Sequence, residues 1–97
     1  MDRDANAPQS PPSVYEHVYM LLETMAHVSW QKLGLQPDTI TGKIEANMPE
    51  AKVAVDLVAH LAGVLETQLD GDDRRRVQNL LRDLRINYLQ RSTEANS

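Results

Sequence analysis

The sequence predicts an all-α fold, a three-helix domain assembled as a helical homodimer, from three observations. Apolar residues recur at the spacing of an amphipathic helix in three separate segments. Residues typical of turns, among them Gly34, Pro37 and Gly71, lie between those segments. The first two segments carry apolar residues over about half of the helix circumference, which is more than one further helix covers. This surplus of apolar surface predicts self-association.

The first helix is expected at residues 14–32 and is predicted to be long. Ser13 and Glu16 have the spacing of a capping box, and Gly34 is placed to end the helix in the left-handed conformation. An apolar stripe on this helix is widened by a neighbouring row of apolar side chains. The stripe contains Val14, Val18, Leu21, Met25 and Val28, and the row contains Tyr15, Leu22, Ala26 and Leu33.

A crossing loop at residues 35–46 should lead to the second helix, with Ile40 and Ile44 as its apolar anchors. Asn47 is the expected N-cap, and Glu50 the expected capping-box partner. This helix should extend to about Gln68. Its wide apolar arc contains Ala51, Ala54, Val55, Val58, Ala62 and Leu65, flanked by Val53, Leu57, Leu61 and Val64.

The third helix should follow a tight turn at Asp70-Gly71 and fade near Ser92. Its apolar stripe is narrow, which is typical of a helix buried on one side only. The stripe contains Val77, Leu80, Leu81, Leu84 and Tyr88. The predicted organisation is therefore a flexible proline-rich tail at 1–12, a three-helix domain at 13–92 and a flexible tail at 93–97.

Composition narrows the class of protein. A chain of 97 residues forms one domain that buries about 60–65% of its unfolded surface, so its stability is marginal. The absence of cysteine excludes disulfides and thiolate metal ligands, and fits a reducing compartment. No segment approaches the roughly 18 apolar residues of a membrane span, and the first ten residues lack the apolar core of a signal peptide. We therefore expect a cytoplasmic protein that makes no membrane contact.

The wide arc of the first helix supplies the candidate interface. Two copies related by a two-fold axis would bring these arcs together and bury small and large side chains alike. Trp30 is the best single anchor, because interfaces favour tryptophan and tyrosine at their most important positions. The predicted interface residues are Leu22, Met25, Ala26, Ser29 and Trp30.

Arginines gather in the C-terminal segment. Residues 71–97 contain six arginines against four carboxylates, in a chain whose net charge is −4. Arg75, Arg82 and Arg85 project away from the leucine stripe and form a candidate face for an anionic partner. Interleaved aspartates favour a solvated face instead, and nucleic acid is not the expected partner. Arg85 could also pair with a buried carboxylate at a helix junction.

Candidate chemical sites are weak. Asp56 and His60 share a helix face and could offer two metal ligands, but pairing of Asp56 with Lys52 is the preferred interpretation. His17 and His27 lie about 15 Å apart along their helix, so they cannot bind the same metal ion within one chain. Thr41-Gly42-Lys43 lacks the other residues of a phosphate loop, so a turn explains it. We expect no catalytic residue, no metal site and no cofactor, and hence no enzyme activity.

Several short stretches, taken in order, resemble a known family. They are Thr41-Gly42-Lys43, Met48 to Ala51, Val55-Asp56-Leu57, Leu69, Asp72-Asp73, Leu81 and Leu84-Arg85 with Tyr88. This order is similar to the small bacterial family catalogued as domain of unknown function 1844. Many members carry a Lys-Thr-x-Gly-Asn stretch where this chain has residues 64–68 as Val-Leu-Glu-Thr-Gln. The resemblance implies a small bacterial helical protein of the cytosol and brings no established activity.

The expected function is that of a non-enzymatic, self-associating protein-interaction module, with a second copy of the chain as its first partner. Any other protein partner is not identified by the sequence. The alternative is a nucleic-acid-associated accessory protein that uses the arginine-rich third helix. Salt separates the two, because phosphate contacts weaken steeply as the salt concentration rises.

Overall fold

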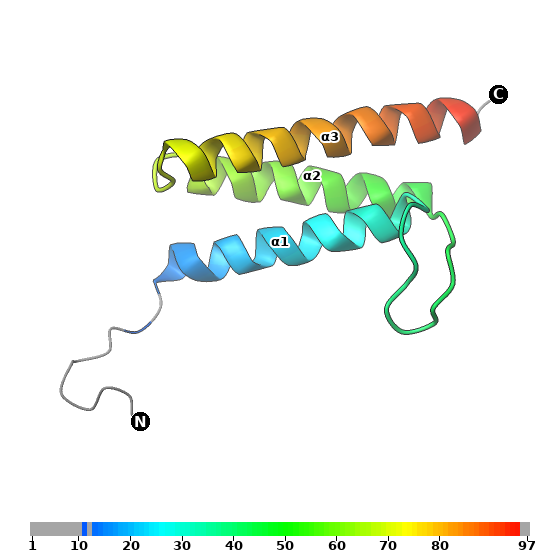
Figure 1. Ribbon diagram of the computed structural model, residues 1–97, viewed down its shortest axis with the longest axis horizontal. Helices are drawn as coiled ribbons and strands as arrows, with labels where there is room; N and C mark the ends of the chain where they lie inside the picture. Colours follow the sequence, from blue (N-terminus) through cyan, green and yellow to red (C-terminus); the bar gives the residue numbers. More distant parts are fainter. Residues whose placement is uncertain (1–10, 12, 96–97) are drawn as a thin grey trace.

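The computed structural model describes residue 11 and residues 13–95, and the regular secondary structure within them is all helical. The helices are α1 (Val14–Lys32), α2 (Met48–Leu65) and α3 (Gly71–Ala95). α2 lies between the other two (Figure 1), packing most extensively against α1 and less against α3. α1 and α3 touch at few positions. The predicted all-α, three-helix fold is confirmed. The predicted tail at 1–12, except for Pro11, lies outside the described residues. Residues 96 and 97 lie outside them as well.

α1 has the predicted bounds because both of its ends are set by local chemistry. The Ser13 hydroxyl accepts the Glu16 N–H at 3.2 Å, and the Glu16 carboxylate accepts the Ser13 N–H at 2.7 Å, so the capping box is complete. Gly34 follows the helix with φ +80° and donates its N–H to the Gln31 carbonyl at 3.0 Å. A residue with a side chain is strained at that φ, which explains the glycine.

α2 begins as predicted, but only half of the expected capping box forms. The Asn47 side chain accepts the Glu50 N–H at 3.2 Å. The Glu50 carboxylate instead lies 3.1 Å from the Lys32 ammonium group, while the Asn47 N–H donates to the Lys32 carbonyl at 2.8 Å. Glu50 therefore ties the start of α2 to the end of α1. α2 ends at Leu65, before the predicted end near Gln68, whose N–H donates back to the Leu65 carbonyl in a turn.

α3 begins at Gly71, directly after Asp70, so the pair that the sequence predicts as a tight turn forms the start of the helix. The Asp70 carboxylate accepts the Asp73 N–H at 2.8 Å, which caps the helix. The helix continues to Ala95, past the predicted end near Ser92, so residues 93–95 of the predicted tail are helical. No glycine or proline interrupts it after Gly71, and an Arg91–Glu94 ion pair of 3.4 Å supports its last turn. α1 is long, as predicted, with 19 residues, and α3 is longer still, with 25.

The loop between α1 and α2 is held by polar contacts, and the prediction that Ile40 and Ile44 anchor it is wrong. Ile40 is 94% exposed and Ile44 is exposed as well. The Gln31 side chain instead donates to the Thr39 hydroxyl at 2.8 Å. The Asp38 carboxylate accepts the N–H groups of Ile40 and Thr41 at 2.8 and 2.9 Å, and these bonds hold its pKa below the ordinary value of 3.8. Thr41-Gly42-Lys43 is the turn that the sequence indicated, since the Gly42 N–H closes it on the Asp38 carbonyl.

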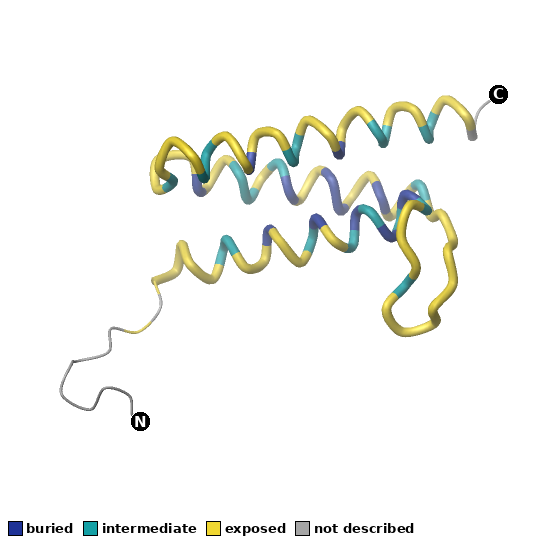
Figure 2. The backbone as a smooth tube through the Cα atoms, viewed as in Figure 1, coloured by how far each residue is buried: buried dark blue, intermediate teal, exposed yellow. Residues whose placement is uncertain are grey.

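The hydrophobic core lies mainly between α1 and α2. Figure 2 shows the buried positions along the facing sides of these two helices, while most of α3 is exposed. Full burial of one such side chain contributes roughly 1.5–3 kcal/mol relative to exposure. The largest fully buried apolar side chains are Leu22, Leu33, Val58, Leu65 and Leu84. α3 adds only a narrow stripe, as predicted, because Leu80, Leu81 and Tyr88 are half-buried beside Val77 and Leu84. None of the described helices is both long and apolar enough to cross a membrane.

Candidate functional site

The structure places most of the predicted interface within the single chain. Leu22, Ala26 and Ser29 are at most 5% exposed and belong to the contact between α1 and α2. The Ser29 hydroxyl donates to the Met25 carbonyl at 2.8 Å, which satisfies its polar atom locally, as expected for a buried helical serine. These three residues belong to the core and not, as the sequence predicts, to an interface between copies, because α2 of the same chain already covers them. Met25 and Trp30 are half-buried at the edges of that contact.

The exposed part of the apolar arc on α1 is the stripe, whereas the neighbouring row supplies Leu22, Ala26 and Leu33 to the core. Leu21 is 54% exposed and Val14 is more exposed still, with the other members of the stripe half-buried. The spacing of the stripe alternates between four and three residues, which is the spacing of a helix-pairing seam. Its residues are Val14, Val18, Leu21, Met25 and Val28.

α2 carries an exposed apolar stripe of its own. Val53 is 67% exposed, Leu57 and Val64 are exposed to a lesser degree, and Leu61 is half-buried. These side chains are the flanking residues that the sequence placed beside the main arc of the helix. They stay uncovered because the buried side of α2 is already divided between α1 and α3.

The two stripes lie on the same side of the α1–α2 pair, the side that faces away from α3. On α1, Tyr19 faces α3, because its hydroxyl lies beside the Arg76 guanidinium and raises the pKa of that group. Leu21 lies about 160° around the helix from Tyr19. On α2, Ala59 and Ala62 line a cavity with residues of α3. Leu57 lies about 160° around the helix from Ala59, and Val64 about 160° from Ala62, so both point away from α3.

We call this surface the outer face and define it by its two stripes. It comprises Val14, Val18, Leu21, Met25 and Val28 of α1, and Val53, Leu57, Leu61 and Val64 of α2. None of these side chains is charged. The Lys32–Glu50 ion pair lies at one end of the face, and His17 and His60 lie along its two margins. Trp30 lies about 180° around α1 from Leu21 and so does not belong to it.

The three arginines predicted as an anionic-partner face differ in their surroundings. Arg75 pairs with Asp72, one turn earlier, and Arg82 lies 3.6 Å from the Asp83 carboxylate. These two charges are therefore neutralised along α3, as the solvated-face interpretation predicts. Arg85 has no such carboxylate partner among the described residues. It is exposed, so the buried ion pair suggested for it does not form.

Arg85 lines a groove between α2 and α3. The groove holds a cavity of about 200 Å³ lined by Lys52, Val55, Asp56, Arg85, Tyr88 and Leu89. The Lys52 ammonium group donates to the Asp56 carboxylate at 2.8 Å, which confirms the preferred pairing of Asp56. This bond raises the pKa of Lys52. The sequence could not locate the groove, because it depends on which faces of two helices meet.

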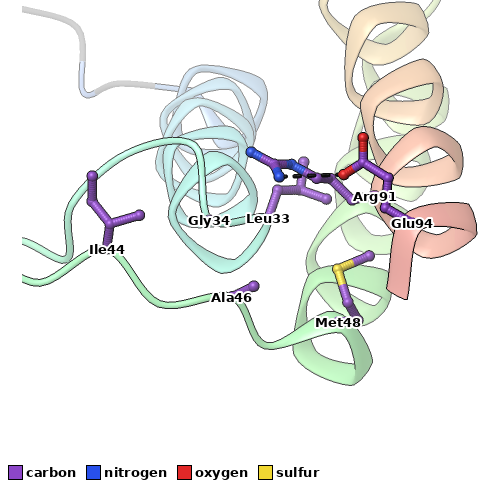
Figure 3. Close-up of a pocket in the computed structure, with 7 residues that line it drawn as sticks. All are labelled: Leu33, Gly34, Ile44, Ala46, Met48, Arg91 and Glu94. Carbon is purple, nitrogen blue, oxygen red and sulfur yellow. Dashed lines mark hydrogen bonds and ion pairs between the residues drawn. The ribbon is translucent and has the colours of Figure 1, made fainter. Parts of the chain in front are cut away.

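A second cavity, of about 310 Å³, lies at the end of the bundle where α1 ends and α2 begins. Figure 3 shows Leu33, Ala46 and Met48 around it, together with Gly34 and Ile44 of the α1–α2 loop. Arg91 reaches across from α3 and is bonded to Glu94. The guanidinium at this cavity is thus already paired with a carboxylate.

The described residues do not bring together a metal centre. No group of three or more His, Cys, Asp or Glu side chains among them could hold a metal ion. Asp56 and His60 share a face of α2, but the Asp56 carboxylate is bonded to Lys52. The Glu16 carboxylate is likewise bonded, within the α1 cap.

The sequence also missed Arg74, which joins α3 to the preceding turn. Its guanidinium donates to the carbonyls of Glu66 and Leu69 at 3.0 and 3.2 Å. The available signal was the Asp70–Asp73 spacing, in which the Asp70 side chain accepts the Asp73 N–H as Ser13 accepts that of Glu16; it places the helix start at Gly71, three residues before Arg74. Arg74 is thereby a structural arginine.

Comparison with known proteins agrees with the resemblance of the short stretches. The model of the family described as domain of unknown function (DUF1844) matches residues 15–90, which include all of α2 and most of α1 and α3. No curated protein and no solved structure matches the chain. Because the match extends over most of the sequence, the chain belongs to the family of domain of unknown function 1844.

Proposed function

We propose that this protein is a non-enzymatic, self-associating interaction module, in which the outer face of one copy packs against the outer face of a second. The observation that carries the proposal is an uncharged apolar surface that extends over two helices and is left uncovered by the third. Single exposed apolar residues are ordinary on soluble proteins, but contiguous patches mark interaction sites.

A second copy of the chain suits this face better than an unlike partner. Depletion of charge is the compositional sign of an interface core, and a face without charges needs no partner of opposite charge. A two-fold axis presents the same patch from both sides, so each α1 stripe can pack on a helix of the other copy. Two α1–α2 pairs would then form a four-helix arrangement with α3 on its outer sides.

The test is the mass of the full chain in solution, measured by sedimentation equilibrium at micromolar concentration. The expected result is twice the chain mass of 10.9 kDa, with dissociation on dilution. Leu21→Glu should shift the mass toward the monomer, because it places a charge in an apolar contact. Met20→Glu is the matched control, since Met20 is 62% exposed, adjoins Leu21 in sequence and projects about 100° away from the outer face.

A parent chain that sediments as a folded monomer would contradict the proposal without any variant. Equal dissociation of Leu21→Glu and Met20→Glu would also contradict it, since the effect would not depend on the outer face. A dimer that neither variant weakens would place the interface elsewhere on the molecule.

The nucleic-acid alternative has less support in the geometry. Of the three arginines proposed for it, Arg75 and Arg82 are paired with neighbouring carboxylates, which leaves Arg85 as a single unpaired charge. Nonspecific nucleic-acid binding depends on several phosphate contacts made together.

A further inference from the structure

Arg85 stands apart from the other arginines of α3. Each of the others has a carboxylate partner within 4 Å: Arg74 with Glu66, Arg75 with Asp72, Arg76 with Asp73, Arg82 with Asp83 and Arg91 with Glu94. Arg85 makes no ion pair or hydrogen bond with any other described residue. Its charge is therefore available to a ligand.

Arg85 also borders a cavity whose surface is mainly apolar. Val55 forms a buried wall of the groove, Tyr88 is half-buried, and Leu89 stays 64% exposed at its rim. The volume of about 200 Å³ accommodates a group about as large as one side chain. A ligand here would meet a cation and an apolar surface together.

We propose that the α2–α3 groove binds a carboxylate that carries a short apolar chain. A guanidinium offers N–H donors in a planar fork, which matches the two oxygens of a carboxylate. Lys52 lines the same cavity, and its charge is balanced by Asp56. The apolar chain would cover Val55 and Leu89, removing exposed apolar surface from water.

The charge of the groove favours a carboxylate over a phosphate. Lys52 and Arg85 contribute two positive charges and Asp56 one negative charge, so the net charge is +1. A single carboxylate balances this charge. A phosphate monoester carries about −1.5 to −2 at neutral pH, and its excess charge would be repelled by the Asp56 carboxylate.

Two sources supply this chemistry, namely a free aliphatic acid and the C-terminal carboxylate of a peptide that ends in an apolar residue. Both present one carboxylate beside one apolar group. The first probe is 4-methylpentanoate, and its neutral control is 4-methylpentanamide, which has the same shape. The second pair of probes is a short peptide ending in leucine, with either a free or an amidated C-terminus.

The experiment is an amide chemical-shift titration of the full chain with each probe. We expect 4-methylpentanoate to saturate with a Kd in the millimolar range, and to shift the amides of Val55, Arg85, Tyr88 and Leu89. Arg85→Gln should weaken binding about tenfold or more, because it removes a charge-assisted bidentate contact. The matched control is Arg82→Gln, which removes an exposed arginine outside the groove and should leave the Kd unchanged.

Equal binding of the acid and the amide would overturn the proposal, as would equal weakening by Arg85→Gln and Arg82→Gln. Absence of localised shifts with both the acid and the free peptide would overturn it too. If the peptide with a free terminus binds more tightly than the acid, the source is a chain terminus; if it does not, the source is a free acid. The groove and the outer face lie on different sides of α2, so the Leu21→Glu variant should bind the acid like the parent. Failure of acid binding would therefore leave the proposed dimerisation untouched, and failure of dimerisation would leave the proposed acid binding untouched.

Discussion

Gly34, just after α1, lies against Ala46, which precedes α2. A methyl group placed on Gly34 would lie 3.1 Å from the Cβ atom of Ala46. Gly34 also has φ +80°, a conformation that side chains disfavour. Gly34→Ala should therefore destabilise the protein through both strain and overlap. We expect its free energy of unfolding, measured by urea denaturation, to fall by more than the roughly 1–2 kcal/mol of the backbone strain alone.

Gly42→Ala provides the matched control for that prediction. Gly42 has a similar φ of +72°, but an added Cβ would meet no atom within 4 Å. This variant should therefore lose only the backbone contribution. Equal losses of unfolding free energy for the two variants, at equal protein concentration, would show that the overlap with Ala46 is relieved without loss of stability.

The ends of the helices show which parts of a fold local sequence determines. The start of α1 follows from Ser13 and Glu16 alone, and the prediction was right because both hydrogen bonds are made within four residues. Glu50 has the same relation to Asn47, yet its carboxylate bonds to Lys32. A tertiary contact replaced the local one, and no spacing within the α2 segment signals it.

The candidate interface shows the limit of helix-wheel reasoning. The wheel identified an apolar arc on α1 wider than one partner helix covers, and the structure leaves part of that arc exposed. It does not say which part of the arc faces the neighbouring helix. The pattern predicts Leu22, Ala26 and Ser29 at the interface, yet they lie in the core, whereas Leu21 and Val14 of the stripe are exposed.

Ala26→Glu and Leu21→Glu should therefore have different consequences. Ala26 is 5% exposed between α1 and α2, so a glutamate there would bury an unpaired charge within the fold. We expect loss of cooperative unfolding and of helical content, measured by circular dichroism at several protein concentrations. The Leu21→Glu variant should keep its helical content while the mass of its assembly in solution falls toward that of the monomer. A folded, monomeric Ala26→Glu variant would instead return Ala26 to the interface.

The α1–α2 loop should respond to acid through Asp38. The pKa of this carboxyl is lowered by hydrogen bonds from the N–H groups of Thr41 and Ile40. A lowered folded pKa means that the charged form stabilises the loop above the ordinary pKa of 3.8. That stabilisation should disappear as the pH falls below 3.8 through the lowered value. Amide hydrogen exchange at Ile40 and Thr41, corrected for its intrinsic pH dependence, should show protection lost over that range.

Asp38→Asn is the control for the loop. Its amide oxygen can still accept the two N–H bonds, but it does not titrate, so the corrected protection should not depend on pH near 4. An acid response that persists in Asp38→Asn would assign the effect to another group.

Replacing Arg75, Arg82 and Arg85 together with glutamate tests the basic side of α3. All three side chains are exposed, and among the described residues Arg75 and Arg82 form ion pairs only with carboxylates of their own helix. Exposed pairs of this kind contribute little to stability, so the helical content and the mass should stay close to those of the parent chain. The parent should show no binding to duplex DNA or RNA at physiological salt. Binding that the charge reversal abolishes, and whose affinity falls steeply with rising salt, would establish the nucleic-acid alternative, because counterion release from phosphates produces that dependence.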